Sequence, residues 1–435
     1  MLSDQYAHPN QTLHGSARDE GASKGAWRFQ NNIKTDDQAL LAAHYQSVVA
    51  RAKGRCVVFG VHDTSELHFA TQTQKAENGT LRSKKDLGFL VHPTVIFTPE
   101  KLSLGSIDVN LWSRDPSEYG KSKARANRPI EEKESYRWLL SYRQLVRFQQ
   151  ELPHTEVISI SDAESDIYEL FLETQNHSQG PHLLLRAAYN RSLDDEVEKL
   201  WPHMEKHSSA FEMEIEIPRK GTQAARLAQI QVSFAPIHLK TPNSKQGPSI
   251  ALYAVYAREI HPPEGVEALN WMLLSTRKVR KAKHALTLMN WYACRWQIDF
   301  FFKILKTSCR VLDDQTHQTG HFQMNLAFKF IVAWRIAYTT MLSREKPDES
   351  SQIAFEEAEW KALYCHHYKT NQFPDSPPSL QETTLMLARL GGYKKSEKNR
   401  PPGPQTLAKG YAILSSLSSM VRLMNGKEKT ESCFL

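Results

Sequence analysis

Long apolar segments are missing from this 435-residue sequence, and no uninterrupted run approaches the roughly 18 residues that a membrane-spanning helix needs. The first residues, MLSDQYAHPNQ, do not join a basic segment to an apolar one, which excludes a typical secretory signal. The five cysteines are scattered without a CxxC pair, so neither a disulfide framework nor a structural zinc site is indicated. We therefore expect a cytoplasmic protein with no membrane partner.

Glycine-rich phosphate loops and nucleophile elbows are also missing, which disfavours a carbohydrate or small-molecule enzyme. What is present is 40% hydrophobic and 24% charged residues, a balance that allows sizeable buried cores. The 55 Lys and Arg residues against 48 Asp and Glu residues give a net charge of +7, which permits a nucleic-acid partner without proving one. The length predicts roughly three domains.

The hydrophobic pattern predicts an α/β protein that changes character along the chain. Residues 1–35 are polar and weakly periodic, so we expect a loosely ordered leader. Short buried strands then alternate with helices up to about residue 210, and residues 211–257 change to a period of two, typical of an antiparallel β insertion. Helical spacing returns near residue 285 and continues through the C-terminal region.

Two aspartates follow buried strands directly. Asp63 comes after the apolar run at residues 55–62, and Asp162 comes after residues 157–161. Ligands of open α/β sheets gather at such strand ends. The alternative interpretation is that each aspartate only caps a helix or forms a turn.

The segment WYACRWQIDFFFKILK, at residues 291–306, is the most informative one. We expect a long helix over about residues 285–307, and on its helical wheel an arc of about 80° holds one hydroxyl, one carboxylate and three cations. These are Tyr292, Arg295, Asp299, Lys303 and Lys306. One interpretation is a solvated face with ion pairs at i,i+4. The other is a carboxylate that holds a metal among cations that hold a phosphodiester.

The spacing Tyr292-x₂-Arg295-x₃-Asp299-x₆-Lys306 resembles the Y-(2)-R-(3)-E-(6)-K signature of the insertion-sequence-four transposases, the group that contains the transposon-five enzyme. HDTSELHF at residues 62–69 is similar to the first-aspartate motif of that family, and ISDAESDIYELF at residues 160–171 is similar to the second. EIHPPEG, WMLLST and LARLGGY…PPGPQTL follow in the family's order, so the resemblance covers roughly residues 25–425.

The resemblance implies a cut-and-paste DNA transposase with an RNase H-like catalytic core. Asp63, Asp162 and Asp299 would be the catalytic acids and would bind two Mg²⁺ or Mn²⁺ ions. Six residues would contact DNA: Arg186, Trp271, Tyr292, Arg295, Lys303 and Lys306. The implied partners are the double-stranded DNA of the transposon ends and target, and a second copy of the chain in a synaptic homodimer. The implied location is the nucleoid of a bacterial cytoplasm.

The resemblance also implies five segments. They are a short leader at 1–50 that is the remnant of an N-terminal DNA-binding region, a first part of the core at 51–210, a β-rich insertion at 211–265, a core completion with the signature helix at 266–320, and a helical C-terminal dimerisation region at 321–435.

Three departures from the family pattern predict reduced activity. The third acid is Asp299 rather than Glu, and Ala163 stands where the family has Arg. The leader keeps GAWRFQNN at residues 25–32 but lacks the helical part that recognises the transposon end. The alternative is a catalytically defective, truncated transposase that binds DNA, or heterodimerises and inhibits intact relatives. A plain nuclease is disfavoured by Trp271, Tyr292 and Arg295, which suit binding of a DNA end.

Overall fold

The computed structural model describes residues 1–8, 11–32, 37–69, 78–83, 85–120, 128–194, 198–217, 225–314, 316, 318–394 and 401–424. These residues divide into two compact units. The first unit comprises Met1–Lys53, Thr64–Lys123 and Gln297–Leu435, and the second comprises Gly54–Asp63 and Ala124–Trp296. Along the described residues, no helix combines the length and the apolar composition that crossing a bilayer requires.

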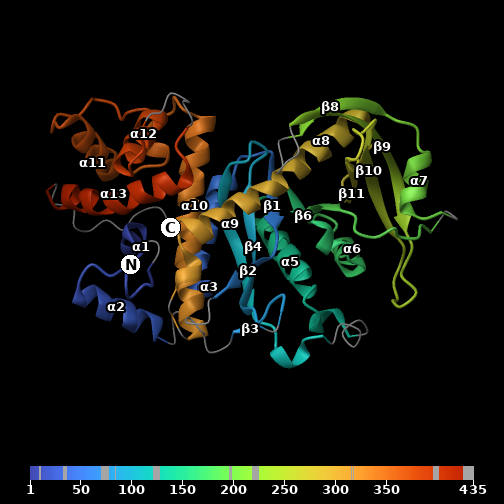
Figure 1. The fold of residues 1–435 in the computed structure, drawn as a ribbon, viewed down its shortest axis with the longest axis horizontal. Coiled ribbons are helices and arrows are strands. Elements are labelled where there is room, and N and C mark those ends of the chain that lie inside the picture. Colours follow the sequence, from blue (N-terminus) through green and yellow to red (C-terminus); the bar gives the residue numbers. More distant parts are fainter. Residues whose placement is uncertain are drawn as a thin grey trace. The chain divides into compact units, whose positions relative to one another are not determined.

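The second unit is built on a mixed sheet whose strand order is β1-β6-β7-β11-β10-β9-β8 (Figure 1). Its strands are β1 (Val57–His62), β6 (Glu156–Ser161), β7 (His182–Arg186), β8 (Phe211–Ile217), β9 (Arg226–Leu239), β10 (Ile250–Ile260) and β11 (Asn270–Ser275). β1, β6 and β7 are parallel, whereas β11, β10, β9 and β8 continue the sheet in antiparallel pairs. This arrangement confirms the predicted α/β pattern and the antiparallel strands expected at residues 211–257, where apolar and polar residues alternate along β8.

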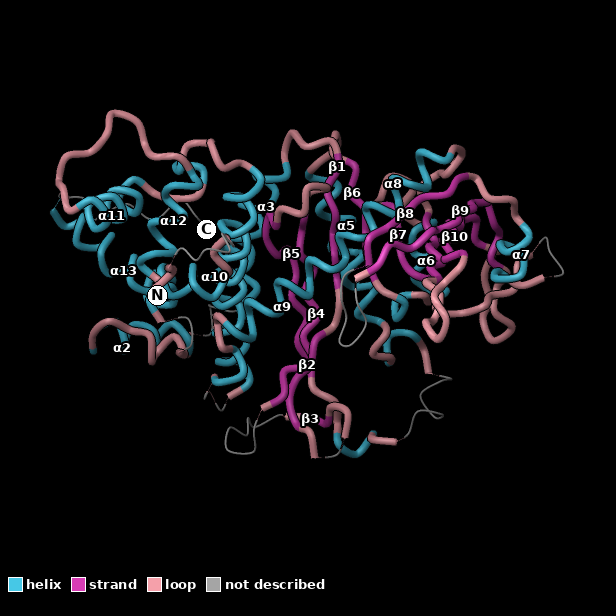
Figure 2. The backbone as a smooth tube through the Cα atoms, turned by 45° about the horizontal axis from the view of Figure 1, so that its top comes forward, coloured by secondary structure: helices cyan, strands magenta, loops and turns pink. Residues whose placement is uncertain are grey.

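Helices cover both faces of this sheet. They are α5 (Tyr136–Glu151), α6 (Tyr168–Gln175), α7 (Leu200–Lys206) and α8 (Ala282–Tyr292), with 3-10 turns η3 (Ile130–Glu132), η4 (Ala163–Ser165) and η5 (Ala293–Trp296). α5 and α6 lie beside β6 and β7 (Figure 2). Trp138, Tyr142 and Phe171 of these helices pack with Leu183 and Leu185 of β7 in one buried cluster. Because side chains alternate along a strand, Leu184 and Arg186 of β7 project to the opposite face.

The first unit contains a smaller antiparallel sheet and most of the helices. In the sheet, β4 (Leu87–Phe97) pairs with β2 (Ser65–His68), β3 (Gly79–Thr80) and β5 (Ser103–Trp112). The helices are α1 (Leu2–Ala7), α2 (Glu20–Gln30), α3 (Asp37–Ala52), α9 (Gln297–Thr307), α10 (Thr319–Glu345), α11 (Glu357–Tyr368), α12 (Leu380–Leu390) and α13 (Pro404–Met424), with 3-10 turns η2 (Pro116–Glu118), η6 (Val311–Asp313) and η7 (Ser351–Ile353). The predicted helical C-terminal region is confirmed.

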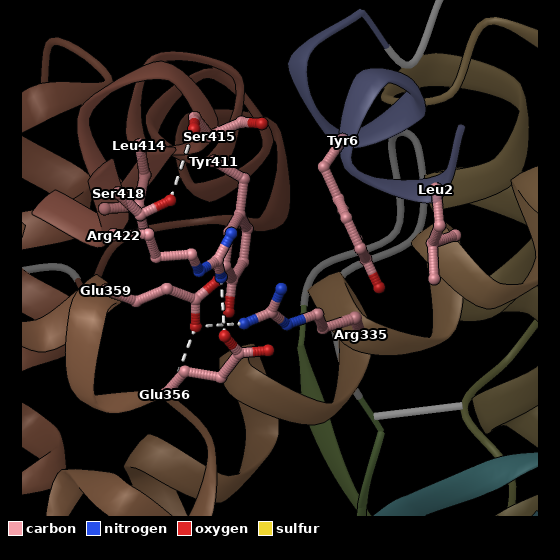
Figure 3. A pocket seen from close by; sticks show the side chains of 10 residues that line it. All are labelled: Leu2, Tyr6, Arg335, Glu356, Glu359, Tyr411, Leu414, Ser415, Ser418 and Arg422. Carbon is pink, nitrogen blue, oxygen red and sulfur yellow. Dashed lines mark hydrogen bonds and ion pairs between the residues drawn. The ribbon is translucent and has the colours of Figure 1, made fainter. Parts of the chain in front are cut away.

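A buried ion pair ties together the helical part of the first unit. Arg335 of α10 donates to Glu359 of α11 at 2.5 Å, and both side chains are less than one-tenth exposed. The guanidinium lies between the rings of Tyr6 and Tyr411, 4.9 and 4.8 Å from their centroids (Figure 3). Such a pair is tolerated in the interior because cation–π contacts and hydrogen bonds replace the lost water.

The expectation of a loosely ordered leader is wrong. Residues 1–35 contain α1 and α2, and α1 packs against α13. Tyr6 is 8% exposed and contacts Arg335, whereas Ala26 of α2 packs in a small cluster with Phe328. A six-residue helix has no stability of its own, so its order comes from these tertiary contacts, which a weak local pattern does not reveal.

Candidate nucleic-acid and metal site

Three of the predicted site residues lie at the same position on adjacent parallel strands. Val61 of β1 pairs with Ile160 of β6, an offset of 99 residues, and the same offset separates Asp63 from Asp162. Ser161 of β6 pairs with Leu185 of β7, an offset of 24 residues, and Arg186 follows Asp162 by that number. Neighbouring strands lie about 4.8 Å apart, so two carboxylates and a guanidinium share one edge of the sheet.

Each aspartate already has a polar partner. Asp162 Oδ1 accepts a hydrogen bond of 2.9 Å from the backbone N–H of Glu164, and Asp162 is the N-cap of η4. Asp63 Oδ2 accepts from Arg295 Nη1 at 3.0 Å, and both side chains are less than one-fifth exposed. The capping interpretation of Asp162 is therefore correct, and this role leaves its carboxylate at the same strand edge as Asp63.

A cavity of about 190 Å³ opens beside this edge and has space for a planar ring as well as for water. It is lined by Asp162, Ala163, Arg186, Ala257, Trp271, Leu273, Met289, Tyr292, Ala293, Arg295 and Trp296. Five of the predicted DNA-binding and metal-binding residues are therefore in one cavity. They are Asp162, Arg186, Trp271, Tyr292 and Arg295.

The sheet and α8 build the cavity from opposite sides. Leu273 of β11 pairs with Arg186 of β7, and Trp271 of β11 pairs with Ala257 of β10, so these four residues share one face of the sheet. Tyr292, the last residue of α8, comes from the helix that covers this face. The cavity consequently has an indole on one wall and a phenol on another.

Burial raises the pKa of the Tyr292 hydroxyl to about 12. The cations of Arg295 and Arg186 lower this pKa, whereas the carboxylates of Asp162 and Asp63 raise it. All four charges therefore lie close enough to act on the phenol. Tyr292 keeps its proton at neutral pH and is available to donate a hydrogen bond to an anionic group.

Two residues that the sequence analysis did not select also shape the site. Trp296 is 59% exposed, lines the cavity and carries the Arg295 guanidinium 4.3 Å from its ring centroid. Asp166 is fully buried and accepts hydrogen bonds from the backbone N–H groups of Ala188 and Tyr189 and from Arg191 Nε. Asp166 thereby fixes the loop after Arg186. In the sequence, Trp296 is marked by its position directly after Arg295. Asp166 has no local signal beyond its place in the motif at residues 160–171.

The predicted continuous helix at residues 285–307 is wrong. The chain forms α8, then the 3-10 turn η5, then α9. A 3-10 turn has 3.0 residues per turn, so the helical wheel does not apply across residues 293–296. The segment contains no Gly or Pro that marks a break. Two tertiary contacts accompany the break: Cys294 is buried, and Arg295 donates to Asp63. Such contacts override local helix propensity.

The remaining predicted residues belong to the first unit. Asp299 and Lys303 are exposed on α9, with Asp299 in its first turn. Lys306 Nζ donates to Ser65 Oγ at 2.8 Å, and burial lowers the pKa of this half-buried ammonium. The meeting of Asp299 with Asp63 and Asp162 stays a prediction. Within the part of the chain that the structure describes, no group of three or more His, Cys, Asp or Glu side chains is arranged to hold a metal ion.

The donor set at the strand edge fits a hard cation. Asp63 and Asp162 offer carboxylate oxygens, and the described cavity lining contains no imidazole or thiol. Mg²⁺ typically takes one or two carboxylates and completes its octahedron with water and substrate phosphate. These two residues therefore suit Mg²⁺ better than zinc or copper.

Comparison with known proteins identifies a regional match in the C-terminal part of the chain. Residues 331–430 match the family model described as the transposase Tn5 dimerisation domain. A cryo-EM structure of a piggyBac transposase synaptic complex with hairpin DNA aligns over 99% of this chain and 72% of that one, with 7% identity and a TM-score of 0.40. A TM-score of 0.40 is too low to define a common fold. The C-terminal helices thus resemble a transposase dimerisation domain, and the match lies inside the predicted region at 321–435.

Proposed function

We propose that the chain is a DNA transposase of cut-and-paste type that works as a homodimer on transposon ends and target DNA. The observation that carries this proposal is the alignment of Asp63, Asp162 and Arg186 on three adjacent strands, beside a cavity lined by Trp271 and Tyr292. The match of residues 331–430 to the Tn5 dimerisation domain supports it independently. The RNase H-like nature of the core is part of the same proposal.

Asp63 and Asp162 would hold Mg²⁺ or Mn²⁺, with Asp299 as the third carboxylate for a second ion. The bound ions would activate a water or a DNA 3′-hydroxyl and stabilise the leaving oxygen. Arg186 and Arg295 bind phosphate oxygens. Arg295 donates to Asp63 at 3.0 Å, so its guanidinium already lies beside a carboxylate that would hold the metal.

Trp271 and Tyr292 bind the end of the duplex. The half-buried Trp271 indole stacks on an unpaired base, which is worth about 1–3 kcal/mol. The neutral Tyr292 hydroxyl donates to a neighbouring phosphate. On α9, Lys303 and Lys306 contact the backbone of the same strand, and Lys306 exchanges its bond to Ser65 for a phosphate oxygen.

Strand cleavage and transfer by the purified chain test this function. The substrate is a linear duplex carrying the terminal repeats that flank the chain's own gene, and the products are nicked ends and joints to a supercoiled plasmid. We expect Mg²⁺- or Mn²⁺-dependent products that disappear in Asp63→Asn and in Asp162→Asn. Glu151→Gln, which neutralises an exposed carboxylate on α5 of the same unit, is the control and keeps activity. Equal activity of Asp63→Asn and the control would contradict the proposal.

Asp299→Glu tests the third acid. The Glu side chain is one methylene longer, and a displacement of about 1 Å at a reacting centre costs roughly 100-fold in rate. We therefore expect Asp299→Glu to raise the strand-transfer rate at least several-fold and Asp299→Asn to abolish it. Unchanged rates in both variants would remove Asp299 from the catalytic set.

A second candidate function is inhibition of intact relatives by a catalytically defective chain. The observation that favours it is Ala163 in the cavity lining, next to Asp162, where the resembling family has an arginine. Addition of the purified chain to an active relative then lowers its strand transfer in proportion to heterodimer formation. A chain that forms no heterodimer by sedimentation cannot act in this way.

A further inference from the structure

Six basic residues crowd into the connection between β11 and α8 and the first turn of α8. They are Arg277, Lys278, Arg280, Lys281, Lys283 and His284, and we name residues 277–284 the basic loop. The 31 residues from 268 to 298 contain no Asp or Glu. None of these residues belongs to the Tyr292–Lys306 signature.

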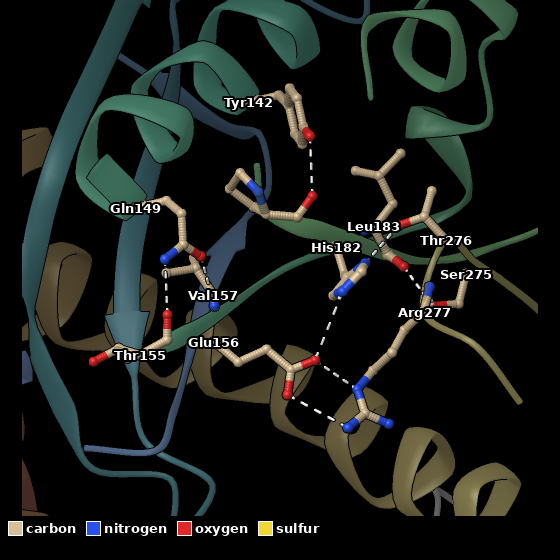
Figure 4. Close-up of polar contacts among 11 residues, drawn as sticks. Tyr142, Gln149, Thr155, Glu156, Val157, His182, Leu183, Ser275, Thr276 and Arg277 are labelled. Carbon is tan, nitrogen blue, oxygen red and sulfur yellow. Dashed lines mark hydrogen bonds and ion pairs between the residues drawn. The ribbon is translucent and has the colours of Figure 1, made fainter. Parts of the chain in front are cut away.

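The basic loop is held firmly at its first residues. Arg277 Nε donates to Glu156 Oε1 at 2.6 Å (Figure 4). The guanidinium of Arg277 also lies 4.9 Å from the centroid of the Trp291 ring. Thr276 Oγ1 accepts from the backbone N–H of Leu183, and Val279 is 2% exposed. Glu156 is the first residue of β6, so the loop leaves the sheet at the edge opposite Asp162.

The other cations of the basic loop are exposed, and no neighbouring carboxylate of the described residues offsets their charge. Lys278, Arg280, Lys281 and Lys283 are exposed. None of these four makes an ion pair with a carboxylate of the residues that the structure describes, whereas Arg277 pairs with Glu156. The loop thus presents about four positive charges in six residues to the surroundings.

The start of α8 makes this concentration of charge unfavourable in the isolated chain. Lys281 is the N-cap, its side chain makes no capping hydrogen bond, and the first turn contains no acid. Helix N-termini carry a partial positive charge, so cations near them are destabilising at low ionic strength. A bound polyanion reverses the sign of this contribution.

We propose that the basic loop binds the phosphate backbone of duplex DNA as a contact separate from the cavity. This inference rests on the proposed function, from which the DNA partner comes. α8 has 11 residues, so about 16 Å separates Lys281 from Tyr292, which corresponds to roughly five base pairs along a duplex. The contact adds affinity without sequence preference, because it reaches only phosphates. The C-terminal end of α8, at Tyr292, thereby contacts the transposon end, and its N-terminal end, at Lys281, contacts the flanking duplex.

Salt dependence of DNA binding by the full chain tests this inference. The test variant is Lys278→Gln/Lys281→Gln/Lys283→Gln. The control variant, Lys199→Gln/Lys206→Gln/Lys240→Gln, removes the same net charge from exposed lysines elsewhere in the second unit. The probe is a 30-base-pair duplex of random sequence, and the readout is the slope of log K against log salt concentration. Each lost phosphate contact decreases the magnitude of this negative slope by about 0.9.

We expect the slope of the test variant to become shallower, its magnitude decreasing by about 2–3. The slope of the control variant should stay near the wild-type value. Equal slopes in both variants, with wild-type binding intact, would overturn the role of the loop and leave the proposed function standing. Absence of DNA binding by the wild-type chain would overturn both. Binding to phosphatidylserine vesicles that only the test variant loses, with unchanged DNA slopes, would assign the loop to a membrane surface instead.

Discussion

At the scale of single residues, the site depends on a phenol that stays protonated. Burial raises the pKa of Tyr292 to about 12. The carboxylates of Asp162 and Asp63 add to this increase, whereas the guanidiniums of Arg295 and Arg186 oppose it. The ionisation of this one group is isolated by subtracting the alkaline absorbance titration of Tyr292→Phe from that of the wild type. We expect the difference signal to be flat through pH 10 and to rise only above about pH 11. A midpoint near pH 10 would contradict the buried position.

The same shift predicts a pH dependence of stability. The folded state holds the Tyr292 proton more tightly than the unfolded state, whose phenol titrates near pH 10. The contribution of this group is therefore fully present below pH 10 and is lost as the pH rises through about 12. The free energy of unfolding of Tyr292→Phe falls less steeply in that window than that of the wild type.

At the residue scale, the position of Asp63 and Asp162 at strand ends could be predicted, because each follows an apolar run and strand ends are visible in a sequence. Arg186 was named only through the family resemblance, and the roles of all three residues stay predictions. Asp166 was not assigned its structural role, since its partners at Ala188 and Arg191 lie more than 20 residues away. The place of Asp299 relative to the other acids stays a prediction.

At the scale of elements, β1 passes so close to α5 that only glycine fits at position 60. A Cβ there would lie 2.3 Å from Leu145 Cδ2, and Leu145 is fully buried. We expect Gly60→Ala to destabilise the protein by about 1–3 kcal/mol, because an overpacked core must shift. The measurement is the free energy of unfolding in urea.

Gly25→Ala is the matched control for this substitution. Gly25 lies in the exposed interior of α2, and a Cβ there meets nothing within 4 Å. Alanine in a helix interior is favoured over glycine by roughly 0.5–1 kcal/mol, so the sign of the effect is opposite. If both variants lost stability equally, the steric explanation at Gly60 would fail.

The Arg335–Glu359 pair predicts an asymmetric response to substitution. Arg335→Met leaves the Glu359 carboxylate buried without a cation and is expected to cost about 3–5 kcal/mol of unfolding free energy. The double variant Arg335→Met/Glu359→Leu removes both charges and should regain most of that loss. A double variant as unstable as the single one would show that packing against Tyr6 and Tyr411, rather than charge, dominates.

Strands and helices were predicted best where a regular pattern of apolar residues extends over many residues. The strands of the insertion follow a clear period of two and α13 a period near 3.6, whereas α10 is buried along most of its length without a distinct polar face. The order in the leader and the break at η5 were missed because both arise from tertiary contacts. Neither Ala293 nor Cys294 carries a local signal for a 3-10 turn.

At the scale of the whole molecule, α13 predicts where two chains meet. Its outward face carries Gln405, Lys409, Ile413, Ser416 and Met420, and it turns apolar toward the C-terminal half, where Ile413 and Met420 are 45% and 61% exposed. This helix lies within the region that matches the Tn5 dimerisation domain. We expect Ile413→Glu/Met420→Glu to shift a dimer to monomer by at least tenfold in dissociation constant, measured by sedimentation equilibrium. Gln405→Glu, on the polar half of the same face, should leave the dimer intact.

The matching offsets of Asp63, Asp162 and Arg186 have an evolutionary consequence. Hydrogen-bond register, and not loop length, decides which side chains become neighbours, so related chains can gain or lose residues between β1 and β6 without separating the two acids. A slip of one residue inside β6 itself would instead bring Ser161 or Ala163 opposite Asp63 and turn Asp162 to the other face of the sheet. Length variation among relatives should therefore collect in the connections and spare these three strands.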